Sequence, residues 1–184
     1  QELKETVFKD LVASELAEKA KLIVQDCVIE TDLEILIPDT YVNNTSERLQ
    51  LYSRLDNLRN EKELEEFSVE VKDRFGPIPQ SVQELINSVR LRWYGERLGF
   101  EKLSLKGDKL RAYFVTNNDK YFASDTFGHI LSFVKAHSRQ CKVRDTAGKA
   151  MLVVDNITSV DAAIELLRSM SHQSSRPESE ILSR

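Results

Sequence analysis

Cysteine is scarce in this chain of 184 residues, and long apolar runs are absent. The two cysteines, Cys27 and Cys141, lie far apart and neither belongs to a C-x-x-C pair, so we expect no disulfide framework and no zinc cluster. Two buried thiols in a reducing cytoplasm are the simpler interpretation. No segment reaches the roughly 18 apolar residues of a membrane span, and no apolar stretch follows a basic start as in a signal peptide. We therefore expect a cytoplasmic protein without a membrane partner.

Glycine-rich catalytic motifs are also missing. The six glycines form no G-x-x-x-x-G-K-[ST] phosphate loop, no G-x-G-x-x-G turn and no nucleophile elbow. All of them fall at expected turns or helix ends except Gly95 and Gly128. The histidines His129, His137 and His172 are scattered without a companion ligand at helical spacing, which is typical of surface residues. The sequence thus predicts no cofactor, no metal site and no catalytic residue.

Charge is abundant and unevenly distributed. The chain carries 26 Lys/Arg and 30 Asp/Glu, a net charge of −4. Residues 1–89 hold 19 acidic and 10 basic side chains, whereas residues 90–149 hold 13 basic and 6 acidic ones. We therefore expect a boundary near residue 90, between two surfaces of opposite sign. Attraction between the halves, or plain solvation, explains this pattern as well as a binding role does.

The N-terminal half has the pattern of helices around one strand. Residues 2–24 have helical spacing almost from the first residue, Gln1, which indicates a fragment of a longer chain. Residues 27–37 alternate apolar and polar side chains, so we expect a half-buried strand, ended by Pro38.

Three helices with recognisable ends follow this strand. Asn44 offers a cap to the first, and Asn60 with Glu63 forms a capping-box pattern that opens the second. Gly76 ends the second helix and Gly99 the third, because glycine readily adopts the left-handed conformation of a helix end. The expected apolar faces are Leu51, Leu55 and Leu58 in the first helix, Leu64, Phe67, Val71 and Phe75 in the second, and Val82, Leu85, Ile86, Val89 and Trp93 in the third, over residues 80–98.

Beyond residue 100 the hydrophobic period changes. Residues 102–115 and 141–154 predict two β-hairpins, and helices are expected at 125–136 and from Thr158 onward, with a polar tail from Ser169. The fold class is therefore α+β, with a helical N-terminal half packed against a hairpin–helix–hairpin–helix C-terminal half. In the first of these two helices we expect four side chains to face inward, namely Phe127, Ile130, Leu131 and Val134.

The outer face of the helix at 61–75 is acidic. With Val71 facing inward, a helical step of about 100° turns Glu66 and Asp73 nearly opposite to it and Glu70 to the side, with Arg74 on the flank. An outward acidic strip of this kind is typical of solvated surface, and by residue types alone that interpretation is as good as a binding role.

The two hairpins are basic. Their cations are Lys102, Lys106, Lys109 and Arg111 on the first and Arg139, Lys142, Arg144 and Lys149 on the second, with Tyr113, Phe114, Tyr121 and Phe122 nearby. Cations beside aromatic side chains suit single-stranded nucleic acid. However, the whole chain has a pI of about 5.5, whereas dedicated nucleic-acid modules usually exceed about 9. Nucleic-acid binding by the hairpins therefore stands as an alternative function.

Two stretches carry a family resemblance. The first comprises residues 33–42 (LEILIPDTYV) and 47–55 (ERLQLYSRL), and the second comprises residues 63–79 (ELEEFSVEVKDRFGPIP). Together with Leu91-Arg92 and residues 98–102 (LGFEK), they make this chain resemble the C-terminal domain of the bacterial transcription-repair coupling factors, the Mfd family.

The resemblance implies a domain plan and a role. Residues 1–24 would be the tail of a preceding helicase region, 25–170 the C-terminal (TRCF) domain, and 171–184 a disordered tail. Within the domain, the helical subregion would span about 44–99 and the α+β subregion about 100–170. The whole protein would be an ATP-dependent DNA translocase that acts on stalled RNA polymerase and recruits UvrA in DNA repair. The domain itself would be a non-catalytic, autoinhibitory module.

The resemblance also implies an interaction site. The domain would fold back on the UvrB-like module of the same protein and mask its UvrA-binding surface, while RNA polymerase and DNA would be met through other domains. The family's docking residues correspond to Glu70, Asp73 and Arg74, with Glu66 beside them. A purely structural cap remains a further alternative.

Overall fold

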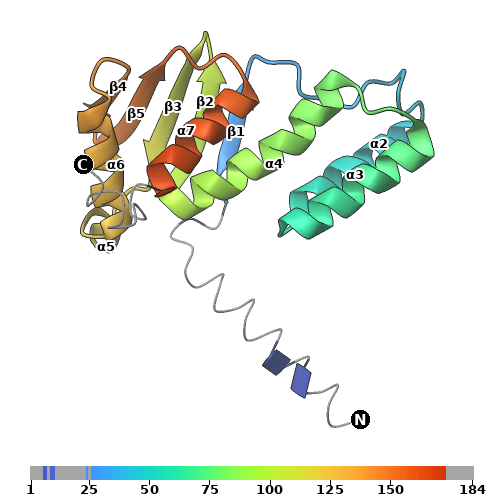
Figure 1. The fold of residues 1–184 in the computed structure, drawn as a ribbon, viewed down its shortest axis with the longest axis horizontal. Coiled ribbons are helices and arrows are strands. Elements are labelled where there is room, and N and C mark those ends of the chain that lie inside the picture. The colour runs from blue at the N-terminus through green and yellow to red at the C-terminus, as the bar shows by residue number, and fades with distance from the viewer. Residues whose placement is uncertain (1–5, 8, 11–23, 25, 173–184) are drawn as a thin grey trace, which may run out of the picture.

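The computed structural model describes residues 6–7, 9–10, 24 and 26–172. Figure 1 shows a sheet that is covered on one face by helices. The elements, in chain order, are β1 (Val28–Thr31), α2 (Thr45–Asn57), α3 (Glu61–Phe75), α4 (Gln80–Leu98), β2 (Phe100–Lys106), β3 (Lys109–Phe114), α5 (Asp119–Phe122), α6 (Asp125–Ala136), β4 (Cys141–Thr146), β5 (Lys149–Asp155) and α7 (Val160–His172). The longest helix, α4, extends beyond the sheet, and the helices α2 and α3 pack as a pair near its far end. The expected α+β class is confirmed. No helix within the described ranges has the length and apolarity to cross a bilayer.

Side-chain caps fix the helical part where the sequence predicts them. The Asn44 side chain accepts from the Glu47 N–H at 3.0 Å, and the Asn60 side chain accepts from the Glu63 N–H at 2.9 Å. The second cap lacks the reciprocal hydrogen bond of a standard capping box. The Glu63 carboxylate accepts from the N–H of Arg59 at 2.8 Å and not from that of the cap residue, Asn60. α2, α3 and α4 thus begin, and α3 and α4 end, within a residue of their predicted positions.

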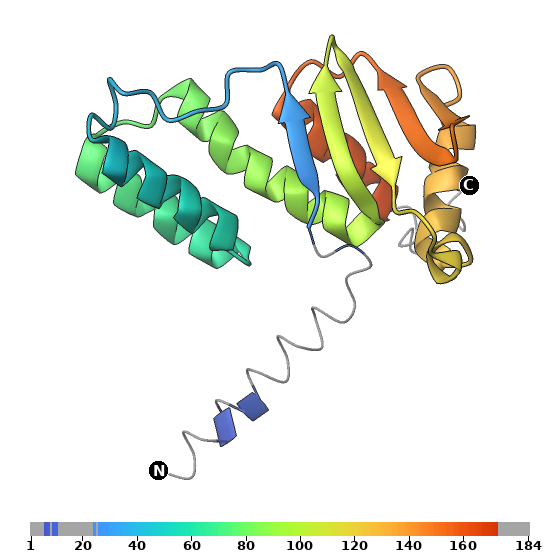
Figure 2. The same ribbon diagram turned by 180° about the vertical axis from the view of Figure 1, so that it is seen from behind.

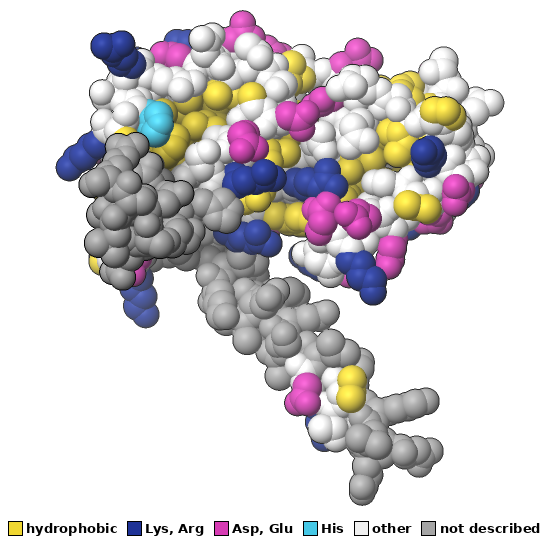
Figure 3. All heavy atoms as spheres, in the orientation of Figure 1, with side chains coloured by type: hydrophobic (Ala, Val, Ile, Leu, Met, Phe, Trp, Pro, Cys, Tyr) yellow, Lys and Arg dark blue, Asp and Glu magenta, His cyan; other side chains and the backbone are white. Residues whose placement is uncertain are grey.

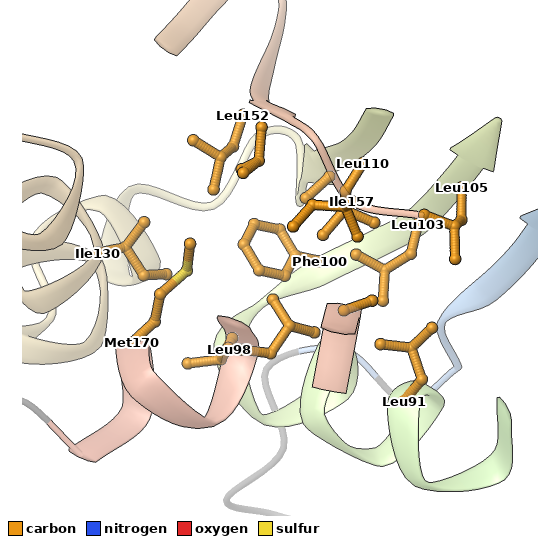
Figure 4. Close-up of a cluster of buried hydrophobic side chains, with 14 of the residues drawn as sticks. Leu91, Leu98, Phe100, Leu103, Leu105, Leu110, Ile130, Leu152, Ile157 and Met170 are labelled. Atoms are coloured by element: carbon orange, nitrogen blue, oxygen red, sulfur yellow. The ribbon is translucent and has the colours of Figure 1, made fainter. Parts of the chain in front are cut away.

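The chain has two hydrophobic clusters, and α4 contributes to both. The first half of α4 packs Val82, Ile86 and Val89 with the buried side chains of α2 and α3. Its second half places Leu91 and Leu98 in the larger cluster under the sheet. That larger cluster surrounds Phe100, which lies among leucines, Ile130, Ile157 and Met170 in Figure 4. Both cysteines are free and buried in this cluster, as predicted.

The sheet is mixed and has the strand order β1-β2-β3-β5-β4. Its two hairpins, β2–β3 and β4–β5, are joined by antiparallel pairing of β3 with β5, and β1 adds to the outer edge of β2 in parallel. α4, α6 and α7 pack against one face, and in Figure 2 the other face of the sheet is turned to the viewer with the helices behind it. The sequence predicted neither the parallel pairing of β1 with β2 nor the short helix α5.

The strand expected over residues 27–37 is wrong in length, because β1 spans only Val28–Thr31. The next N–H, of Asp32, still donates to Leu105 O at 3.3 Å, while its carboxylate accepts from Gly107 N at 3.0 Å. At that point β2 turns into β3, so no strand remains for the chain to pair with. The alternation of burial nevertheless continues to Ile37, whose N–H donates to Tyr52 Oη at 2.7 Å.

Three expectations about the later helices are corrected. In α6, Leu131 is 37% exposed, whereas Phe133, which was not expected inside, is 5% exposed and packs with Ile130 in the core. α7 begins at Val160, two residues after the expected Thr158, and Ser159 caps it, since Ser159 Oγ accepts from Ala162 N at 3.1 Å. α7 also continues past Ser169 and buries Met170 completely, so the polar pattern there marked a helix surface. The helix predicted over 2–24 and the tail over 171–184 lie almost wholly outside the described residues.

Candidate docking surface on helix α3

The outer side of α3 carries all four residues that the sequence singles out. Its inner side is anchored by Leu64, Phe67 and Val71, each at most 3% exposed. The opposite side forms a shallow hollow along the helix, lined by Lys62, Glu65, Glu66, Val69, Glu70, Asp73 and Arg74. The amphipathic pattern of α3 therefore places its charged residues as predicted, and the structure then separates them into two groups.

Glu70 belongs to the first group, because it is engaged within the domain. Its carboxylate lies 2.5 Å from Arg54 Nη2 of α2 and 3.9 Å from Arg74 Nη1. The hydrogen bond from Arg54 is the main reason why the pKa of the Glu70 carboxyl lies below its usual value. The Arg54 guanidinium also lies 5.2 Å from the centre of the Phe67 ring. Glu70 thus joins α3 to α2 within the domain.

Arg74 is engaged in the same way. Its Nη2 donates to Glu47 of α2 at 2.8 Å, and its guanidinium lies 4.8 Å from the centre of the Phe75 ring. Both side chains of the Glu47–Arg74 pair remain more than 40% exposed, so the pair contributes less than about 1 kcal/mol to stability. Because Arg54, Glu70, Arg74 and Glu47 form one continuous chain of ion pairs, substituting Glu70 or Arg74 disturbs the contact between α2 and α3.

Glu66 and Asp73 form the second group. Both are exposed, and within the part of the chain that the structure describes neither makes an ion pair or a side-chain hydrogen bond. Between them on the same side of the helix lies Val69, which is 60% exposed. Sequence reasoning missed Val69, although its positions three after Glu66 and four before Asp73 place it in their row. A strip of Glu66, Val69 and Asp73 is therefore free to meet another surface.

This strip has the chemistry of a contact surface. Two carboxylates around an apolar side chain can receive cations and cover apolar area. Within the described ranges, no group of three or more His, Cys, Asp or Glu is placed to hold a metal ion. Where α3 meets α4, Glu61 forms an ion pair with Arg90. Figure 3 shows acidic and basic side chains next to each other on the face that it presents.

Fold and surface together define a class, namely an α+β domain whose helical pair carries an exposed charged strip. Residues 31–125 match the model of the TRCF domain family. The chain belongs to this family, whose members are domains of DNA-repair proteins. The matched range includes α2, α3, α4 and the first hairpin, and therefore the whole of the candidate surface.

Sequence comparison with individual proteins agrees with the family assignment. The transcription-repair-coupling factor of Rickettsia prowazekii (strain Madrid E) is 34% identical over 116 residues, which is 63% of this chain and 10% of that protein. The factor of Escherichia coli (strain K12) is 34% identical over 102 residues, or 55% of this chain and 9% of that protein. The chain thus spans about a tenth of the length of these relatives.

A solved structure shares the fold. The crystal structure of the C-terminal domain of a transcription-repair coupling factor superposes with a TM-score of 0.65 and covers 82% of this chain and 96% of its own. The identity is 18%, so the likeness establishes the arrangement of helices and strands only.

Proposed function

We propose that this chain is the C-terminal regulatory domain of a transcription-repair coupling factor and that the α3 strip closes onto the UvrB-like module of the same protein. In the closed state the domain masks the surface that UvrA would bind. The observation that carries this proposal is the strip itself, with Glu66 and Asp73 exposed, lacking a partner within the described residues and flanking the exposed Val69. Glu70 and Arg74 take part from the rim, already held by α2.

Physical reasoning supports a docking role for such a strip. Charges that make no ion pair within the domain contribute little to its stability. When docking buries such a charge against an opposite charge, removing either one weakens the interface by several kcal/mol. A contact within one protein gains further from the high effective concentration that a linker imposes. The strip can therefore be weak as an isolated surface and still hold the closed state.

The remaining parts of the proposal concern the whole protein. Residues 25–170 form the domain, with the segment before it belonging to a helicase region, and the full protein is a cytoplasmic, ATP-driven DNA translocase. Its contacts with RNA polymerase and DNA are made by other parts of the chain. UvrA is met only indirectly, after the domain opens.

The test reverses the charges of Glu66 and Asp73 and leaves Glu70 and Arg74, which pair with α2, unchanged. In Glu66→Lys/Asp73→Lys, the free energy of unfolding of the isolated domain should stay within about 0.5 kcal/mol of wild type, because both sites are exposed. In the full-length protein, losing about 2.7 kcal/mol of closing energy shifts the closed-to-open ratio about a hundredfold, at 1.36 kcal/mol per factor of ten. UvrA affinity should then rise to the extent that closure masked its site.

A matched control carries the same change in net charge elsewhere. Glu34 and Asp145 are exposed and make no ion pair among the described residues, so Glu34→Lys/Asp145→Lys should leave UvrA affinity unchanged. Glu70→Lys is a poor probe, since it would also break the pair with Arg54. If UvrA affinity is the same for wild type, strip variant and control, the α3 strip is ordinary solvated surface and the proposal fails.

A further inference from the structure

The sheet has one face that no described helix covers, called the open face below. The register shows which side chains lie on it. Leu103, Leu110 and Leu152 point to the helices, so their neighbours in each strand point the other way. The cations on the open face are Lys102, Lys106, Lys109, Arg111, Lys142, Arg144 and Lys149. Figure 2 views the sheet from this side.

Three of these cations are already matched by carboxylates. Glu30 of β1 lies 3.1 Å from Lys102 Nζ and 3.5 Å from Lys106 Nζ, and Asp155 of β5 lies 3.4 Å from Lys109 Nζ. These pairs occupy the β1 edge and the end of the sheet near the turn at Gly107. Charge on that part of the open face is therefore largely neutralised.

The other four are not matched. Arg111, Lys142, Arg144 and Lys149 make no ion pair within the described residues, and the first three lie together over β3, β5 and β4. Arg111 and Lys142 are the cross-strand partners of Val153 from its two sides, and Arg144 is the partner of Met151. Three cations are thus gathered on neighbouring strands, where their mutual repulsion favours an anionic ligand.

One aromatic side chain lies among these cations. Tyr113 pairs with Met151 across the β3–β5 ladder, so Tyr113, Met151 and Arg144 form one row across three strands. The Tyr113 ring is half-buried and has Lys102 Nζ 5.2 Å from its centre. Neighbours on both sides hold this ring at the open face, where it offers a platform for a flat ligand.

We propose that this part of the open face binds single-stranded DNA, with Tyr113 stacking on a base and Arg111, Lys142 and Arg144 contacting phosphates. An aromatic platform beside cations is what single strands require, whereas a duplex backbone or an acidic peptide would use the cations and not the ring. The acidic pI of the whole chain does not oppose this, because its acidic residues concentrate in the first half. The choice of DNA over RNA rests on the proposed function in DNA repair.

The first measurement is the affinity of the chain for a fluorescent oligo-dT and its dependence on salt. Each phosphate contact with a single strand contributes about −0.7 to the slope of log K against log salt, so three contacts predict about −2. Lys142→Ala/Arg144→Ala should reduce that slope by about 1.4. The control, Lys62→Ala/Lys72→Ala, removes two exposed lysines from α3 and should leave the slope unchanged.

The second measurement isolates the ring. Tyr113→Leu should weaken oligo-dT binding roughly 5- to 150-fold, the range that base stacking supplies, whereas Tyr113→Phe should bind as wild type does. Thermal melts establish that each variant is folded. Because this face is separate from α3, Glu66→Lys/Asp73→Lys should not weaken oligo-dT binding, so failure here and failure of the docking proposal are distinguishable.

Several results would overturn the inference. Absence of oligo-dT binding at about 50 mM salt, where such contacts are strong, is one. Equal affinity of Tyr113→Leu and Tyr113→Phe would leave no role for stacking. Tighter binding of a duplex, of oligo-U or of a poly-glutamate peptide would assign the open face to duplex DNA, to RNA or to an acidic protein partner, respectively.

Discussion

Two glycines inside helices have opposite surroundings. A Cβ built on Gly95 of α4 would lie 2.6 Å from Cys27 Sγ and 3.0 Å from Leu103 Cδ1, whereas one built on Gly128 of α6 would have nothing within 4 Å. Alanine is favoured over glycine in a helix by about 1 kcal/mol at both positions. Only at Gly95 must the neighbours move, and both of those neighbours are buried.

We therefore expect opposite signs for the same substitution. Gly128→Ala should stabilise the chain by up to about 1 kcal/mol, and Gly95→Ala should destabilise it, because overpacking costs about 1–3 kcal/mol and exceeds the gain in helix propensity. Urea titrations would measure both. Removing the obstructing thiol in Cys27→Ala/Gly95→Ala should recover part of the loss, and stabilisation by Gly95→Ala alone would contradict the close packing.

At the residue scale the sequence predicted local chemistry well. Asn44 and Asn60 cap helices as expected, because a cap depends on side chains within three residues. Leu131 and Phe133 were misplaced, because the side of α6 that meets the sheet is decided by β4 and α7. Apolar residues surround much of α6, and periodicity alone does not choose among them.

Among the elements, α3 is attached to α4 through Glu61 and Arg90. Arg90 Nε donates to both Glu61 oxygens at 3.0 Å, and this hydrogen bond is the main reason that the pKa of the Glu61 carboxyl is lowered. A lowered pKa in the folded state gives stability that is complete above the unfolded value of about 4.3 and is lost as pH falls through the folded value.

The element-scale prediction follows from that sign. Glu61→Gln should reduce the free energy of unfolding at pH 7 by less than about 1 kcal/mol, because Glu61 is about half exposed, and should flatten the loss of stability below about pH 4.3. Glu66→Gln on the same helix is the control, because Glu66 makes no ion pair among the described residues. Identical acid profiles for the two variants would show that the pair contributes nothing.

Most elements could be predicted from the sequence, but not all of their partners. The limits of α3 and α4 are encoded in caps and glycines, while the length of β1 depends on where β2 turns, more than seventy residues further on. The candidate surface shows the same division. The outward direction of Glu66, Glu70 and Asp73 follows from the helical period, but the pairing of Glu70 with Arg54 of another helix does not. Whether these residues are a docking site stays a prediction.

For the whole molecule, α4 couples the two hydrophobic clusters. Because it supplies buried side chains to both, neither cluster keeps its full set of contacts if the other unfolds. We expect a single cooperative transition in denaturant. Trp93, the only tryptophan, packs against the helical cluster and reports its unfolding by fluorescence.

The two thiols report the other cluster. Cys27 and Cys141 are buried there, and burial raises the pKa of Cys27 to about 12, so its reactive thiolate is suppressed in the folded state. Thiol labelling and Trp93 fluorescence should therefore share one midpoint in a urea series. Two separated midpoints would show that the helical part and the sheet unfold independently.

The parallel pairing of β1 with β2 has a consequence for the length of the chain between them. Val28 pairs with Lys102, so α2, α3 and α4 all lie within the loop that this pairing closes. The entropy of closing a loop grows only logarithmically with its length, and doubling it costs about 0.6 kcal/mol. Extra residues in the connections between α2, α3 and α4 therefore add little to the free energy of pairing β1 with β2. The helical part can change in size while β1 stays paired with β2.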